Sequence, residues 1–410
     1  MYSAIAAALV AVSVAQAPTP STPPPVPTVI SEERALAARL DGVIDQAIAE
    51  KRIVGTVILV AKDGKVVYRR AAGLADREAG RPMKENEVFR LASVSKPIVA
   101  ATALVLVDQR KLTLDDPITK WLPTFRPKLP DGREPVITVR HLLTHTAGLT
   151  YGFAESEQGP YRRAGVSDGL DASEVSLDEN LRRIASVPLS SEPGKRWGYS
   201  VATDVLGAVV AKAGGASLPQ VVERVLTGPL GMKDTGFSVK DAKRLATPYA
   251  DGKPEPVRMG KEQVVLFNGA GVRFAPGRAL NPRAFPSGGA GMVGTAGDFL
   301  KFLETLRAGG APVLAASTAE QLGSAQVGPE AATQGPGWGF SFVGAVLVDP
   351  AKTGSPQSVG TWQWGGAYGH NWFVDPQRRL TVVALTNTAF EGMSGAFTSS
   401  VRNAVYGTGN

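Results

Sequence analysis

The chain has 410 residues, of which 43% are hydrophobic and 20% charged, and its formal net charge is +7. This length allows a large core in one unit or in two closely packed ones, and the composition is that of an ordinary globular enzyme. The basic residues occur singly or in pairs such as Arg69-Arg70, so no run follows a phosphate backbone and nucleic-acid binding is not supported. The absence of cysteine excludes disulfide and thiolate chemistry.

The first residues have the pattern of a secretory signal. Ala4 to Val14 is a short apolar run, and Ala15-Gln16-Ala17 places small residues at the spacing of a cleavage site. A membrane anchor is the alternative, but the run is too short to span a bilayer. We expect residues 1–17 to be a signal peptide and 18–30 a Pro-rich linker. The mature protein would then be periplasmic or secreted, without stable membrane insertion.

Helical and strand-like patterns alternate after the linker. Apolar residues at helical spacing predict a helix that begins at Ser31 and carries Leu36, Leu40, Ile44 and Ile48 on one face. Two strand-like runs, Thr56 to Ala61 and Lys65 to Ala71, are joined by Asp63-Gly64, a strong hairpin signal. An extended stretch from Val88 to Leu91 then leads into a long apolar helix, Pro97 to Val107.

Short helices and loops predominate from Leu112 to Pro282. The helical segments are His141 to Thr144, Leu177 to Ser186, Val201 to Ala213 and Leu218 to Leu226. Two stretches, Tyr151 to Gly169 and Lys253 to Gly289, are interpreted as long loops, which often border active sites. Beyond a helix at Thr295 to Arg307 we expect strands at Gly337 to Asp349, Gly360 to Trp364, His370 to Asp375 and Leu380 to Thr386, then a last helix at Met393 to Tyr406.

This order of elements predicts an α+β fold. Strands near both ends, with helices between them, indicate one antiparallel sheet built from the N- and C-terminal segments, flanked by helices and interrupted by an inserted, mainly helical region. We expect residues 31–410 to form a single catalytic unit. Its α/β part would comprise about 31–111 and 290–410, and its helical part about 112–289.

Ser93-Val94-Ser95-Lys96 is the one Ser-x-x-Lys sequence of the chain, and it lies at the start of the long apolar helix. A lysine three residues after a serine lies on the same helix face, about 5–6 Å away between Cβ atoms. The positive end of the helix dipole also favours an oxyanion there. Ser93 and Lys96 are therefore candidates for a nucleophile and the group that activates it, with a solvated surface lysine as the alternative.

Two further motifs are candidates for the same site. Tyr199 lies just before a helix, but a phenol accepts a proton only where cations lower its pKa, and a tyrosine buried in the core is the alternative. Trp364-Gly365-Gly366-Ala367 lies on or beside a late strand, where adjacent glycines let a ligand or another backbone approach closely. The Ala367 N–H is then a candidate oxyanion donor opposite the Ser93 N–H, with a bulge or tight turn as the alternative.

In this order and spacing, the three motifs resemble those of the serine β-lactamase and penicillin-binding-protein superfamily. The resemblance is closest to its class C-like branch, which includes the family VIII carboxylesterases and the D-amino-acid amidases. The segments Ile137 to Leu149, Pro229 to Met232 and Gly289 to Thr295 also resemble stretches of this family. The resemblance covers about Val43 to Tyr406, almost the whole mature chain.

The resemblance implies the β-lactamase/transpeptidase-like fold and an acyl-enzyme mechanism without a metal or organic cofactor. Ser93 would attack an ester or amide carbonyl, and Lys96 with Tyr199 would move the proton. The N–H groups of Ser93 and Ala367 would hold the oxyanion, and Trp364, Gly365 and Gly366 would contact the substrate. Which of Lys96 and Tyr199 is the base stays open, because such close groups titrate as a pair.

Two departures from the family pattern favour an esterase. The usual Tyr-x-Asn is here Tyr199-Ser200-Val201, and the usual Lys-Thr-Gly or His-x-Gly is Trp364-Gly365-Gly366. The cation that would pair with a β-lactam carboxylate is missing, which favours neutral esters. His370 is a candidate replacement for that cation. The predicted substrates are short-chain carboxylic esters, and weak β-lactam hydrolysis is compatible with the pattern.

Several alternatives stay open at this point. A β-lactamase or a D-amino-acid peptidase or amidase would use the same groups, and a non-catalytic binding or assembly protein would keep the fold alone. A Ser-His-acid hydrolase would need Gly-x-Ser-x-Gly, which the run Gly392 to Ala396 does not match. His141 and His145 are four residues apart but have no obvious third ligand, so we expect no metal site. The sequence does not indicate an oligomeric state.

Overall fold

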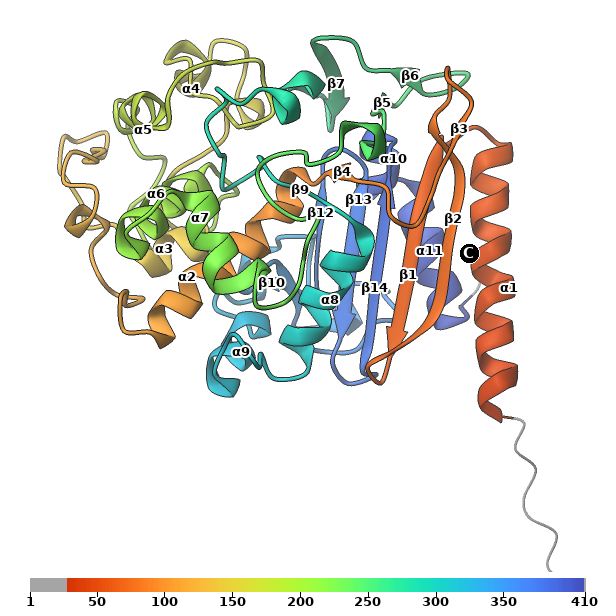
Figure 1. Cartoon of the computed structure of the whole chain (residues 1–410). Helices are drawn as coiled ribbons and strands as arrows, with labels where there is room; N and C mark the ends of the chain where they lie inside the picture. Colours follow the sequence, from red (N-terminus) through yellow and green to blue (C-terminus); the bar gives the residue numbers. More distant parts are fainter. Residues whose placement is uncertain (1–27, 409–410) are drawn as a thin grey trace, which may run out of the picture.

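An eight-stranded antiparallel sheet forms the centre of the structure, in the order β10-β11-β12-β13-β14-β1-β2-β3 (Figure 1). The computed structural model describes the backbone of residues 28–408, with side chains from residue 31. The strands of this sheet are β1 (Gly55–Lys62), β2 (Lys65–Asp76), β3 (Arg81–Pro82), β10 (Trp338–Phe340), β11 (Ala345–Leu347), β12 (Trp362–Gly366), β13 (His370–Asp375) and β14 (Leu380–Thr386). The sheet thus combines segments from both ends of the chain, as predicted.

Different helices cover the two faces of the sheet. The long helix α1 (Thr28–Ala49) and α11 (Ala396–Tyr406) lie against one face, and α8 (Ala296–Arg307) lies against the other (Figure 1). β1 is buried on both sides, because Ile58 packs with α1 and α11 whereas Val57 packs with the helices of the opposite face. A strand buried on both faces is a continuous apolar run, and this explains the sequence of β1.

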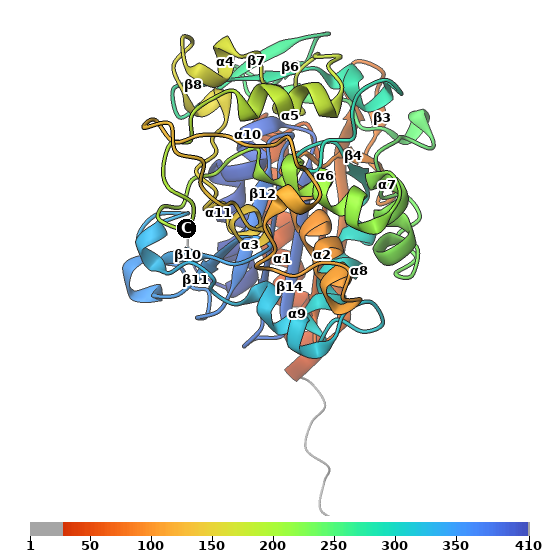
Figure 2. The same ribbon diagram turned by 90° about the vertical axis from the view of Figure 1, so that its left-hand side faces the viewer.

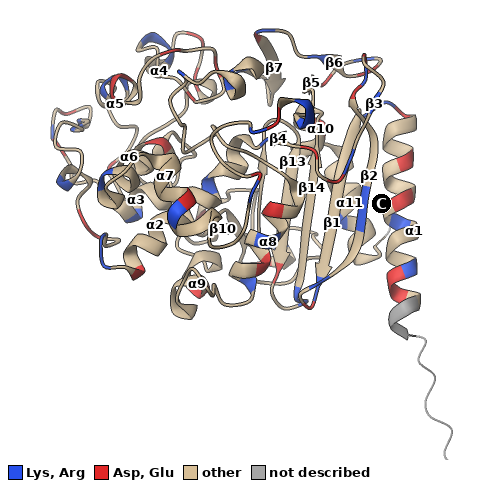
Figure 3. Ribbon diagram, in the orientation of Figure 1, with Lys and Arg blue, Asp and Glu red and all other residues tan. Residues whose placement is uncertain are grey.

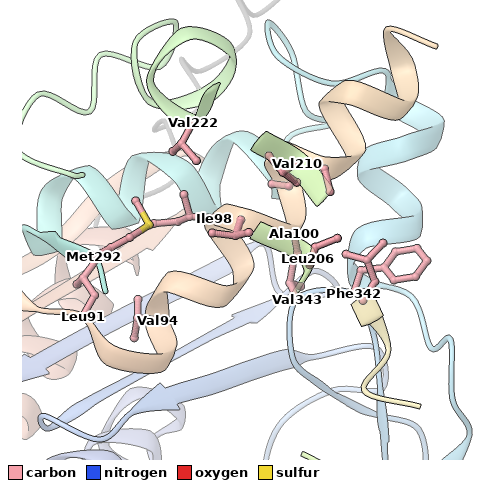
Figure 4. Packing of buried hydrophobic residues seen from close by; sticks show 14 of the residues in the cluster. Leu91, Val94, Ile98, Ala100, Leu206, Val210, Val222, Met292, Phe342 and Val343 are labelled. Atoms are coloured by element: carbon pink, nitrogen blue, oxygen red, sulfur yellow. The ribbon is translucent and has the colours of Figure 1, made fainter. Parts of the chain in front are cut away.

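The helix that follows Ser93 is buried on all sides. α2 (Ser95–Asp108) is buried from Ser95 to Leu106, and Figure 4 shows Ile98 and Ala100 packed beside Leu206 of α6. α2 and α6 lie on the side of the molecule away from α1 (Figure 1), and this side faces the viewer in Figure 2. The other helices are α3 (Val139–Leu143), α4 (Pro160–Arg163), α5 (Leu177–Ala185), α6 (Ala202–Gly214), α7 (Leu218–Val222), which a π-helical turn (Glu223–Thr227) extends, α9 (Ala316–Gly323) and α10 (Ala389–Ser394). A helix that is apolar all round is stable only inside a core, so the position of Ser93 is firmly anchored.

The interpretation of Lys253 to Gly289 as a loop is wrong in part. This stretch contains β6 (Val257–Arg258), which pairs with β5 (Tyr249–Ala250), and the hairpin of β7 (Gln263–Phe267) and β8 (Ala270–Phe274). Asn268 and Gly269 form the turn with φ values of +49° and +82°. Asn-Gly between two strand-like runs is the strongest short hairpin signal, and the sequence analysis overlooked it.

Smaller differences occur at three predicted boundaries. The first helix begins at Thr28 instead of Ser31, while the predicted signal peptide and residues 18–27 of the predicted linker lie outside the described residues. The segment predicted as one strand from Gly337 to Asp349 forms two strands, because the Ser341 N–H closes a tight turn onto the Gly344 carbonyl. The last helix is interrupted at Gly395, whose backbone is extended. The strands predicted at His370 to Asp375 and Leu380 to Thr386 are confirmed to the residue.

Basic and acidic residues are interspersed along the chain (Figure 3). This distribution agrees with the small net charge. Among residues 28–408, no single helix has the length and apolar character needed to cross a bilayer. One pair, α6 with the segment Leu218–Thr227, meets that criterion only when taken together across a bend of 71°.

Candidate active site

Ser93 lies between a short strand and a buried helix. The strand β4 (Phe89–Arg90) pairs with β9 (Val293–Gly294), and a 3₁₀ turn (η1, Ala92–Val94) carries Ser93 to the start of α2. Ala92 has φ = +46°, in the left-handed region that residues with a side chain rarely adopt. Such backbone strain persists only where the surrounding structure holds it, and it is typical of functional sites.

Lys96 points from the first turn of α2 back to Ser93. Its Nζ donates a hydrogen bond to Ser93 Oγ at 3.1 Å and another to the Gly289 carbonyl at 2.8 Å. The ammonium also lies over the ring of Tyr199, 4.7 Å from the centroid, and over that of Tyr151 at 5.4 Å. Lys96 is 6% exposed, so the alternative of a solvated surface lysine is wrong.

Tyr199 reaches the same oxygen from the loop that precedes α6. Its OH donates to Ser93 Oγ at 2.7 Å and accepts a hydrogen bond from Trp364 Nε1 at 3.3 Å. Its ring packs against Tyr151 and Trp364, each with a centroid distance of 5.2 Å. The structure therefore brings together Ser93, Lys96 and Tyr199, which the sequence analysis selected from two distant motifs.

His145 holds the Tyr199 loop in place. Its Nδ1 accepts the Ser200 N–H at 3.2 Å and lies 3.1 Å from Ser200 Oγ, while its carbonyl accepts the Gly198 N–H. Burial lowers the pKa of His145 to about 3, with the Lys96 charge acting in the same direction, so the ring is neutral. The segment around His145 is thus a buried structural turn. No group of potential metal ligands occurs among the described residues.

Asp204 links α6 to the segment that holds Lys96. Its Oδ1 accepts hydrogen bonds from Ser287 Oγ at 2.6 Å and from the Gly289 N–H at 3.3 Å. Because the Gly289 carbonyl is the acceptor of Lys96, the carboxylate fixes the peptide that positions the ammonium. Burial raises the pKa of Asp204, and the hydrogen bond from Ser287 and the charge of Lys96 oppose that shift.

The end of β12 approaches the serine turn very closely. A Cβ atom on Gly366 would overlap the Leu91 carbonyl oxygen, and one on Gly365 would come within 2.8 Å of the His370 carbonyl oxygen. The glycines thus allow the close approach of another backbone that the sequence analysis expected. Ala367 is the first residue of the turn between β12 and β13, and it lines the same cavity as Ser93.

The proposed role of His370 as a substitute cation is wrong. His370 is completely buried, its Nε2 lies 2.7 Å from the Arg90 carbonyl oxygen, and its ring meets Phe89 edge-on. Burial lowers the pKa of His370 to about 4, so the imidazole is neutral. It does not line the cavity beside Ser93.

A cavity of about 510 Å³ opens beside Ser93. Its wall is largely aromatic, from Tyr151, Phe153, Trp197, Tyr199, Phe267, Trp364 and Phe390. Neutral amides contribute as well, from Asn268, Gln334, Gln363 and Asn371. No Lys or Arg belongs to the described residues that line it, and Asp168 is the single carboxylate.

Sequence reasoning missed most of these wall residues. It expected the stretches Tyr151 to Gly169 and Lys253 to Gly289 to border the site, and they do so through Asp168 and through Phe267 and Asn268 at the tip of the β7–β8 hairpin. The Asn268-Gly269 turn was the one local signal for that tip. Nothing local marks Phe390, which reaches the cavity from α10 and stacks on Phe267 with a centroid distance of 4.6 Å.

Comparison with known proteins identifies the family. The profile of the Beta-lactamase family matches residues 40–404. The chain belongs to this family. Esterase EstB of Burkholderia gladioli is 55% identical over 384 residues, which are 93% of this chain and 98% of that protein. Lovastatin esterase of Penicillium rubens is 27% identical over 374 residues, which are 83% of this chain and 90% of that protein.

A solved structure supports the same assignment. EstCE1, described as a hydrolase with promiscuous acyltransferase activity, superimposes with a TM-score of 0.90 at 49% identity and covers 92% of this chain and 100% of its own. The β-lactamase/transpeptidase-like fold and the resemblance to the esterase branch are therefore confirmed. The protein is a serine hydrolase of the β-lactamase family.

The close contact of Gly366 with the Leu91 carbonyl predicts that position 366 does not tolerate a side chain. A Gly366→Ala change forces the β12–β13 turn away from Ser93, and we expect the rate of labelling by a fluorophosphonate probe to fall about 10–100-fold. Gly297→Ala in α8 is the matched control, because its new Cβ meets no atom within 4 Å. An unchanged labelling rate for Gly366→Ala would show that the turn does not position the site.

Proposed function

We propose that this serine hydrolase is a carboxylesterase that cleaves neutral short-chain esters through an acyl-enzyme on Ser93. The observation that carries the proposal is the pair of hydrogen bonds on Ser93 Oγ, from Tyr199 OH at 2.7 Å and from Lys96 Nζ at 3.1 Å, beside a cavity large enough for a small ester. The names of two relatives that align with most of the chain, Esterase EstB and lovastatin esterase, support it.

The proposed reaction proceeds in two acyl-transfer steps. Ser93 Oγ attacks the ester carbonyl carbon while its proton passes to the Lys96–Tyr199 pair, and the N–H groups of Ser93 and Ala367 hold the oxyanion. The pair returns the proton to the leaving alcohol as the acyl group remains on Ser93. Water then attacks the acyl-enzyme with the same pair as base, and the carboxylic acid is released. Both partners contact Oγ, so either lies close enough to take the proton, provided that the attacking state holds one of them in its accepting form, Lys96 as the neutral amine or Tyr199 as the phenolate.

The cavity favours a neutral ester over a β-lactam. A β-lactam carries a carboxylate, which needs a cation, and no Lys or Arg is found among the described residues of the cavity wall. Trp364, in the position of the family's cation, donates its N–H to Tyr199. Ser200 follows the tyrosine directly. Its Oγ is hydrogen-bonded to His145 Nδ1, and Ser200 does not line the cavity.

The first test compares two substrates on the protein without residues 1–17. We expect kcat/KM for p-nitrophenyl butyrate to exceed that for a chromogenic cephalosporin by about a hundredfold or more, since the cephalosporin carboxylate has no partner in the cavity. Ser93→Ala is the blank and should show no acyl transfer. The reverse ranking would identify a β-lactamase, and turnover of D-amino-acid peptides alone would identify a peptidase or amidase.

The second test concerns Tyr199. Tyr199→Phe keeps the ring packing and removes the OH that contacts Ser93, and we expect kcat on p-nitrophenyl butyrate to fall about 100-fold or more, as for the loss of a general acid–base group. Tyr249→Phe is the matched control, because its buried hydroxyl is bonded to Glu78 instead. A near-normal rate in Tyr199→Phe would assign proton transfer to Lys96 alone.

We also propose that residues 1–17 act as a secretory signal, that residues 18–27 serve as a tether, and that the mature enzyme is periplasmic or secreted. The apolar run Ala4 to Val14 followed by Ala15-Gln16-Ala17 supports this. Expression of the full chain should yield an exported protein whose N-terminus is Pro18 by Edman sequencing. An uncleaved protein retained in the cytoplasm would refute the proposal.

A further inference from the structure

The wall of the active-site cavity contains a carboxylate and no basic side chain among the described residues. Among the described residues that line it, Asp168 is the single one with a charged side chain, and Lys96 lies below Ser93, hydrogen-bonded to Gly289. Asp168 Oδ1 accepts the Leu170 N–H at 2.9 Å. Within the part of the chain that the structure describes, no Lys or Arg forms an ion pair with Asp168. Asp168 is half-buried in the cavity wall, so a cation that enters the cavity can reach its carboxylate.

Two arginines line a different cavity. Arg90 and Arg278 line a neighbouring cavity of about 500 Å³, and Leu170 and Ala290 belong to the walls of both cavities. Arg90 donates to the Pro276 carbonyl at 2.8 Å. Arg278 donates to backbone carbonyls as well, among them that of Phe285 at 3.0 Å. These hydrogen bonds hold both guanidinium groups outside the lining of the active-site cavity. The Asp168 carboxylate therefore has no basic side chain beside it in that lining.

The aromatic wall suits a cation as well. An ammonium group within about 6 Å of an aromatic face is attracted by the ring quadrupole, and its alkyl groups gain apolar contact. The site already shows this chemistry, because Lys96 Nζ lies over the rings of both Tyr151 and Tyr199. Phe267 and Phe390 form a stacked pair in the same wall. Aromatic side chains and one carboxylate in the wall of the same cavity suit the recognition of an alkylammonium ion.

We infer that the preferred substrates are esters that carry an ammonium group, such as esters of amino alcohols, and that Asp168 is the specificity-determining residue that pairs with this group. The inference rests on the proposed esterase function and names its substrate class. The ester carbonyl would lie at Ser93 while the ammonium occupies the part of the cavity beside Asp168. Neutral esters would still react, with less binding energy.

The charge state of Asp168 adds a pH dependence. Burial raises the pKa of Asp168 to about 7; the charges of Asp171 and Asp204 act in the same direction, whereas the Leu170 N–H and Arg278 oppose the shift. The charged and titratable groups that face it are Asp171, Asp204, Arg278, Tyr151 and Tyr368, and both tyrosines are neutral because burial raises their pKa values. A cation binds the ionised carboxylate. Cation affinity should therefore increase as the pH rises through this pKa and then level off.

The decisive experiment uses an isosteric pair of esters. Butyrylcholine and 3,3-dimethylbutyl butyrate have the same shape and acyl group, but only the first carries a positive charge. At about pH 8, we expect kcat/KM of the native enzyme to favour butyrylcholine about tenfold or more. Asp168→Asn should abolish this preference, because it removes the charge that pairs with the ammonium and keeps the size of the side chain. Glu157→Gln is the matched control, an exposed carboxylate of the same loop that pairs with Arg273.

A second measurement needs no variant. Tetramethylammonium chloride should inhibit hydrolysis of the neutral ester competitively, more strongly at about pH 8 than at about pH 6, with sodium chloride as the ionic-strength control. Equal inhibition at both pH values, or equal loss of both ester activities in Asp168→Asn, would overturn the inference. If neither ester is cleaved, the proposed function fails. Calorimetric binding of tetramethylammonium to Ser93→Ala would then support the cation site, and absence of binding would refute it.

Discussion

The pairing of β1 with β14 is the constraint on which the active site depends. The two strands lie antiparallel from Thr56 opposite Thr386 to Lys62 opposite Leu380, so the two ends of the chain form one sheet. β14 also pairs with β13, and the turn that leads from β12 into β13 carries Ala367. The segment that leads to Ser93 follows β1 and β2, so this pairing brings the C-terminal turn to the serine. Gly366 completes the contact, since only a glycine fits against the Leu91 carbonyl.

The inserted region supplies the other half of the site through α6. The loop before this helix presents Tyr199, and its first turn presents Asp204, which holds the Gly289 peptide and through it Lys96. Ser93, Lys96 and Tyr199 therefore come from elements that are each anchored in the core. Such preorganisation lowers the reorganisation needed in the transition state.

Local chemistry explains which features could be predicted from the sequence. β13 and β14 are apolar runs between turn signals, and Ser93, Lys96 and Tyr199 stand in short motifs, so each was recognisable within one segment. The orientation of His370 was also accessible, because side chains alternate along a strand and His370 shares its face with Trp372 and Val374, which are in the core. Phe390 and Asp168 could not be predicted, since their place in the wall results from contacts between segments far apart in the chain.

The distribution of cations defines what the cavity can recognise. Lys96 donates hydrogen bonds to Ser93 and to Gly289 and lies over two tyrosine rings. Arg90 and Arg278 donate hydrogen bonds to backbone carbonyls in the neighbouring cavity. An ester carbonyl acquires its negative charge only in the transition state and needs two local N–H donors, whereas a carboxylate substrate carries a full charge that must be matched on binding. The site therefore retains the acyl-transfer machinery of the β-lactamase family without a cation for a carboxylate, and the carboxylate that it contains, Asp168, reverses the sign of charge that the cavity favours.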